Sequence, residues 1–320
     1  MTFVLIRKLL RDVRIPWLVV AVLLFLFQIL WARVTQRVTL QILEQLGKLN
    51  VSPEFIRNTL FSKNDFSGQM IQAIMGGDDI RIENATDLMS ISYVHPLVIT
   101  ILSIWAIGRA TSAIAGEIDR GTMELLLAQP IRRSQILLSH LSVDALIFPA
   151  LCAVLWTGTY CGTWWMGLQP PTASELAQLN MEKEKAEGKP QVVRSKSQQI
   201  DPYIFLRALP CVFALLFAVG GVTMAMSSMG RSRSVVWGCA VSLFLTMFLV
   251  NVLGQIWSDW LGWLRPATIY YHYQPQLMIL GDGWRNPSAW THLVMLVGFG
   301  TGGYAFAWVY FTRRDLPAPL

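Results

Sequence analysis

The chain has 320 residues, of which 53% are hydrophobic and only 14% are charged, whereas soluble domains carry about 25% charged residues. Its mean hydropathy of +0.44 likewise indicates a membrane protein. Much of the net charge of +6 sits in short basic clusters beside apolar runs, and no basic stripe is interleaved with aromatic residues. This distribution argues against nucleic acid as a partner.

The first predicted element is an amphipathic helix over residues 2–14. Its apolar face carries Phe3, Ile6, Leu10 and Val13. Its opposite face carries Arg7, Lys8, Arg11 and Arg14. Such a helix is expected to lie along the cytoplasmic surface of a bilayer. The apolar run that follows is long and lacks a small-residue cleavage site, so we interpret it as a retained span and not a signal peptide.

Six apolar segments match the length of about 20 residues that a helix needs to cross the hydrocarbon core. The predicted spans are residues 15–33, 92–115, 136–166, 203–228, 234–256 and 290–312. The predicted outer loops are residues 34–91, 167–202 and 257–289. The sequence therefore predicts an all-α membrane protein with a single transmembrane domain over residues 1–320.

Basic clusters fall on one side of this topology, in residues 1–14, 109–135, 231–233 and 313–314. The positive-inside rule makes that side cytoplasmic and places both termini there. The last outer loop is rich in Trp and Tyr, which are typical of the membrane interface. We expect short helices at the outer interface in this loop, with a stacking site for sugars or bases as the alternative.

Three ionisable residues lie within predicted spans, near their cytoplasmic ends. Arg109 belongs to the second span, whereas His140 and Asp144 sit one helical turn apart in the third. Because consecutive spans are usually neighbours, Arg109 could pair with Asp144. Charges inside a membrane are expensive and often functional. The sequence leaves two interpretations open, a structural ion pair and a substrate or proton relay site.

Small residues four apart predict close packing between spans. Two such pairs occur, Gly158 with Gly162 and Gly298 with Gly302. The second pair lies in a glycine-rich stretch that superficially resembles a nucleotide loop, but no strand precedes it. We interpret both pairs as helix-packing faces.

No motif for catalysis or cofactor binding is present in the sequence. It contains no GxxxxGK[ST] phosphate loop and no HExxH zinc motif, and the predicted spans contain no GxSx-like nucleophile site. The four cysteines form no CxxC pair and have no histidine at ligand spacing. We therefore expect no catalytic residue, no metal and no cofactor bound by this chain.

The stretch of residues 116–133, GEIDRGTMELLLAQPIRR, interrupts the apolar pattern between the second and third spans. Gly121 predicts a break, Thr122 is the expected N-cap of a short helix, and Pro130 is expected to stop it. Three consecutive leucines would leave apolar surface exposed on so short a helix. An ordinary solvated surface helix and a partner-binding helix are both open from the residues alone.

This stretch and the start of the third span resemble the cytoplasmic segment of type-2 ATP-binding-cassette (ABC) permeases over about 26 residues. The matching positions are Glu117, Arg120, Gly121, Thr122, Leu125, Leu126, Pro130 and Arg132 or Arg133. The six spans and the large first outer loop agree with that family over the whole chain. One departure is His140, which stands where a lysine is common.

The resemblance implies a permease subunit of the cytoplasmic membrane, of a kind that usually exports its substrate. It also implies a separate ATPase that binds ATP and Mg, and a second permease, identical or related. Residues 116–133 would be the coupling helix that contacts the ATPase. Glu117, Arg120 and Glu124 would make charged contacts, Leu125 and Leu126 would form an apolar knob, and Gly121 would allow the bend.

Two other classes of function stay open from the sequence. An ion-gradient-driven carrier would use Asp144, His140 and Arg109, whereas a membrane scaffold would transport nothing. The sequence does not identify the substrate.

Overall fold

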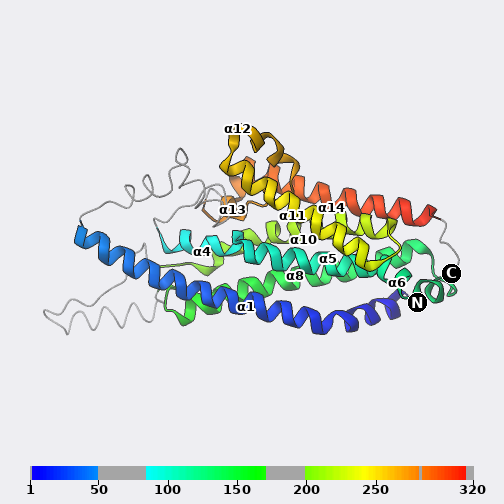
Figure 1. The fold of residues 1–320 in the computed structure, drawn as a ribbon. Coiled ribbons are helices and arrows are strands. Elements are labelled where there is room, and N and C mark those ends of the chain that lie inside the picture. The colour runs from blue at the N-terminus through cyan, green and yellow to red at the C-terminus, as the bar shows by residue number, and fades with distance from the viewer. Residues whose placement is uncertain (1, 50–83, 171–198, 281–282, 315–320) are drawn as a thin grey trace.

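The computed structural model describes residues 2–49, 84–170, 199–280 and 283–314. In these ranges the chain is helical and contains no strand. Six helical segments are long and apolar enough to cross a membrane, which confirms the predicted number of spans. They run side by side as one elongated bundle, with the start of α1 and the end of α14 near the same end (Figure 1).

The observed spans follow the predicted ones closely except at the first two, which extend into both ends of the predicted first outer loop. Their bounds are α1 (Thr2–Leu49), α4 (Ala85–Val94) with α5 (Pro96–Ala113), α8 (Arg133–Trp165), 3-10 helix η2 (Pro202–Ala208) with α10 (Leu209–Met229), α11 (Arg233–Ile256), and α14 (Pro287–Arg313). The outer loops predicted at residues 34–91 and 167–202 lie largely outside the described residues.

The N-terminal amphipathic segment is helical, but the boundary expected at residue 15 does not exist. Residues 2–14 continue into the first span as one 48-residue helix that contains Pro16. Its predicted apolar face is confirmed in part: Ile6, Leu10 and Val13 pack against the main core beside the buried Leu5 and Leu9, whereas Phe3 is 77% exposed. Packing against the other spans thus keeps residues 2–14 in line with the rest of α1. It does so although Pro16 has no backbone N–H and cannot donate a helical hydrogen bond.

The second span is broken where the sequence predicted a continuous helix. α4 ends at Val94, and α5 begins at Pro96 with His95 as its N-cap. The ring of Pro96 disfavours helical geometry at His95, whose backbone is extended in consequence. Nδ1 of His95 accepts a hydrogen bond from the Leu97 amide at 3.2 Å, which caps the new helix.

The last outer loop forms short helices, as predicted. They are α12 (Ser258–Leu261), η3 (Gly262–Ala267), η4 (Tyr270–His272), α13 (Pro275–Leu280) and η5 (Gly283–Arg285). Its aromatic residues divide into two groups. Trp260 and Trp263 are exposed, whereas Tyr270 and Tyr273 are buried and reach Ser103 Oγ (3.0 Å) and the Tyr93 carbonyl (2.8 Å). The loop therefore packs against the second span.

Close helix packing at glycines holds the centre of the bundle together. At Gly158 and Gly162 of α8, an added Cβ would lie 2.9 Å from side chains of α1, which confirms that predicted face. The face predicted at Gly298 and Gly302 is wrong, because a Cβ there would meet nothing within 4 Å. Instead α14 packs on α10 through other glycines, with a Cβ on Gly221 only 2.3 Å from the Gly300 carbonyl oxygen.

We predict that Gly221→Ala lowers the free energy of unfolding by about 1–3 kcal/mol, because the new methyl group overpacks the contact between α10 and α14. Gly298→Ala is the matched control, since its methyl group meets open space. Thermal unfolding of the purified protein in detergent measures both variants. Equal melting temperatures for the two would contradict this packing.

Candidate functional site

The segment between the second and third spans folds into two short helices, α6 (Ala115–Asp119) and α7 (Thr122–Leu127). Arg120 and Gly121 form the turn between them, and Gly121 has a φ of 68°, a conformation that favours glycine. The predicted break at Gly121 is confirmed. The predicted N-cap is wrong, because Gly121 takes the cap position and Thr122 is the first residue of α7.

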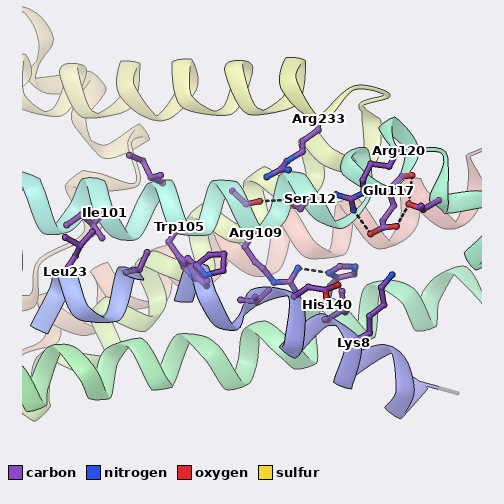
Figure 2. Close-up of a pocket in the computed structure, with 18 residues that line it drawn as sticks. Lys8, Leu23, Ile101, Trp105, Arg109, Ser112, Glu117, Arg120, His140 and Arg233 are labelled. Atoms are coloured by element: carbon purple, nitrogen blue, oxygen red, sulfur yellow. Dashed lines mark hydrogen bonds and ion pairs between the residues drawn. The ribbon is translucent and has the colours of Figure 1, made fainter. Parts of the chain in front are cut away.

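The carboxylate of Glu117 closes this turn. Glu117 is only 8% exposed, and its Oε1 accepts a hydrogen bond from Arg120 Nη2 at 2.6 Å. Its Oε2 accepts a second one from the Thr122 hydroxyl at 2.5 Å, and Figure 2 shows Glu117 and Arg120 facing each other. The polar side chains of the motif thus bond to one another around Gly121.

The apolar residues of α7 divide between the protein and the solvent side. Met123 is 3% exposed, and Leu126 and Leu127 pack partly buried on a cluster that includes Ile136. Leu125 is 69% exposed, and Glu124 beside it is exposed as well. One leucine of the predicted knob is therefore available to a partner, and the other mainly anchors the helix.

The stretch after α7 leads directly into the third span. α7 ends at Leu127, and the exposed Pro130 lies in the turn that follows, consistent with its predicted role as a stop. Arg132 is exposed as the N-cap of α8, and Arg133 is the first residue of that helix.

Hydrogen bonds connect residues 115–133 to α10 and to the end of α14. The Ala115 amide donates to Ser227 Oγ of α10 at 3.1 Å. The side chain of Arg133 donates to the carbonyl of Arg314, just after α14. Arg314 in turn donates through Nη1 to the carbonyls of Ser228 (2.7 Å) and Gly230 (3.1 Å) at the end of α10. α6 is thus bonded directly to α10, and the start of α8 is joined to the ends of α14 and α10 through Arg314.

The three predicted intramembrane residues lie together, close to this segment. Nε of Arg109 is 3.3 Å from Oδ1 of Asp144, so the predicted ion pair is confirmed. Nη1 of Arg109 is 2.8 Å from Nδ1 of His140. All three side chains are more than nine-tenths buried. Arg109 on α5 is thereby joined to α8, consistent with the bracing interpretation of the pair.

Some polar residues of the bundle were not found from the sequence. Tyr304 of α14 donates its hydroxyl to Oδ2 of Asp144 at 3.1 Å and brings the sixth span into the cluster. Gln28 of α1 is fully buried, and its Oε1 accepts from Ser92 (2.9 Å) and Thr159 (3.3 Å). The sequence does contain a signal for this second polar cluster, because Gln28 is a polar residue inside an apolar run.

The described residues include no group of three or more His, Cys, Asp or Glu side chains placed to hold a metal ion. The expectation that this chain binds no metal or cofactor stays a prediction.

Comparison with known protein families identifies the chain. The model of the family described as ABC-2 family transporter protein matches residues 5–316, nearly the whole length. The chain belongs to the ABC-2 transporter family. No match was found among curated proteins. The chain is thus a permease of an ABC transporter and a multi-pass membrane protein, and permeases of this family normally work with an ABC ATPase.

We predict that Asp144→Leu destabilises this ABC-2 permease by about 3–5 kcal/mol, because Arg109 would keep a buried charge without its carboxylate. The double variant Arg109→Met with Asp144→Leu should recover most of that loss, since no charge is then left unpaired. Thermal unfolding in detergent gives both values. If the double variant is no more stable than Asp144→Leu alone, the two side chains do not act as a pair.

Proposed function

We propose that this ABC-2 permease couples ATP hydrolysis on a separate ATPase subunit to the export of a substrate. The observation that carries the proposal is the shape of the α6–α7 segment. It presents an unpartnered apolar side chain, Leu125, next to an acidic one, Glu124, on a helix fixed to the spans. An exposed apolar residue within a charged surround is typical of a docking contact.

In this proposal Leu125, Glu124 and Arg120 touch the ATPase. Half of the Arg120 side chain is exposed, although it also pairs with Glu117. Glu117 itself is buried, so its position favours the task of holding the turn over a direct contact. Gly121 and Thr122 serve the same turn, and Leu126 anchors the helix on the core.

Movement of the ATPase would reach the spans through the bonds already described. The contacts of Ala115 with Ser227 and of Arg133 with Arg314 connect the segment to α10 and α14. These helices pack tightly through Gly221 and Gly300, so they are suited to move as a unit. The proposed mechanism is therefore a rigid displacement of packed helices, not unfolding of a loop.

A second permease would complete the transporter in the cytoplasmic membrane. α11 is the least buried of the six described spans, because only 17% of the residues in its most apolar stretch are buried inside the bundle. It exposes large apolar residues along its length, among them Val235, Leu245 and Leu249. Lipid or another permease would cover such a face, and we propose that α11 contributes to contact with an identical or related partner.

The proposal predicts that Leu125→Asp abolishes co-purification of the ATPase and reduces ATP-dependent transport by at least about tenfold, because a charge would replace the apolar contact. Leu125→Asp is a sharper test than a change at Leu126, whose contacts with the core would be lost as well. A tagged chain expressed with its native partners provides the pull-down.

Val4→Asp is the matched control, because Val4 is 70% exposed, lies near the same end of the bundle and is outside the segment. It should retain the ATPase at the wild-type level. Retention of the ATPase and of ATP-dependent transport by Leu125→Asp would contradict the proposed coupling role.

A further inference from the structure

An amphiphilic cavity of about 720 Å³ lies between α1 and α5, beside the α6–α7 segment. Its volume falls within the range of about 300–1,000 Å³ that is typical of small-molecule sites. One part of its wall is apolar and includes Val20, Leu23 and Ile101. The other part carries charged groups from α1, α5, α6 and α11, which Figure 2 shows around the labelled Arg109.

Cations outnumber carboxylates in the charged part. The wall includes Lys8, Arg109, Arg120 and Arg233, against Asp12 and Glu117. Arg120 is neutralised by Glu117, and Arg109 by Asp144 behind the wall. Lys8 and Arg233 form no ion pair with any residue in the described ranges. With Asp144 included, one positive charge is left over, which suits a ligand with a single negative charge.

Two buried hydrogen-bond donors on the same wall have no acceptor. Nε1 of Trp105 and Nη2 of Arg109 make no hydrogen bond within the described part of the chain, and both residues are only 7% exposed. A buried donor without an acceptor costs free energy. Because neither nitrogen is exposed to the cavity, a ligand would bond to them only after rotation of the Trp105 or Arg109 side chain, and the charge balance sets the ligand class.

The wall also contains a position without a side chain. Gly108 of α5 lines the cavity, and a Cβ there would meet nothing within 4 Å. Packing between helices therefore does not require glycine at this position, in contrast to Gly221 and Gly300. The absence of a side chain keeps the cavity open between its apolar and charged parts.

We propose that this cavity binds an anionic amphiphile, with a phosphodiester-type headgroup at the charged part of the wall that carries Lys8 and Arg233. The hydrocarbon part lies along the apolar wall toward Leu23 and Ile101. The proposal names a ligand class that the function proposed above leaves open. Binding itself does not depend on that function, and only the identification of the ligand as the transported substrate rests on it.

Competition between two lipids tests this binding. The purified chain in neutral detergent is mixed with equal amounts of phosphatidylglycerol and phosphatidylcholine of the same chain length, and bound lipid is counted by native mass spectrometry. We expect the anionic lipid to be preferred by about tenfold, because the headgroups differ in net charge. Free glycerol phosphate should not compete, because it lacks the apolar part. Equal binding of both lipids, or displacement by glycerol phosphate alone, would overturn the proposal.

Two variants locate the binding site. Lys8→Gln with Arg233→Gln should remove the preference for the anionic lipid, whereas Arg11→Gln with Arg231→Gln should keep it. The control pair has the same charge change, with Arg11 on α1 and Arg231 in the turn before α11, but does not line the cavity. An equal loss in both pairs would show that only the general charge of the surface attracts lipid, and would overturn the assignment.

Gly108→Leu should fill the cavity and abolish preferential binding without clashing with a neighbour, and Gly298→Leu on α14 is its control. Size-exclusion chromatography accompanies both variants. Loss of a dimer in Gly108→Leu alone would assign the cavity to a second copy of the chain and contradict a lipid occupant. Failure of any of these binding tests leaves co-purification with the ATPase unaffected, so it is distinguishable from failure of the proposed function.

Discussion

The buried contact between Arg109 and Asp144 connects the parts of this permease that must move together. A charge inside a membrane protein is stable only with a partner, so Arg109 of α5 fixes the position of α8. The hydroxyl of Tyr304 adds α14 to the same carboxylate. Three spans thus meet at one buried charge pair, near the α6–α7 segment. The internal pairing of these groups favours a bracing role over the gradient-driven carrier that the sequence left open.

The α6–α7 segment extends this rigid arrangement out of the bundle. The polar residues of its motif mainly bond to one another, because the carboxylate of Glu117 accepts hydrogen bonds from both Arg120 and Thr122. Leu125 stays exposed, whereas the other apolar residues of α7 pack against the core. The segment also borders the amphiphilic cavity through Glu117, Arg120 and Thr122. An occupant of that cavity would therefore lie against the same turn that is proposed to contact the ATPase.

Hydrophobic length predicted the six spans, because each span must be long and apolar enough to cross the bilayer. The break at Gly121 and the pairing of Arg109 with Asp144 were predictable too, since both follow from local chemistry and the proximity of consecutive spans. Tertiary packing decided the rest. It keeps residues 2–14 in line with α1, and it selects Gly300 over Gly298 as the contact with α10. The burial of Glu117 and the contribution of Tyr304 depend on side-chain directions that spacing alone does not give.

The central claim is that α7 transmits force from an ATPase through Leu125. Photo-crosslinking from a reactive amino acid at position 125 tests it most directly, with position 123, which is buried, and position 4, which is exposed, as controls. The account predicts an adduct from position 125 alone, whose mass identifies a protein with a GxxxxGK[ST] motif, and a yield that changes when ATP is added. Equal adducts from positions 125 and 4, or an ATPase captured only from position 4, would contradict it.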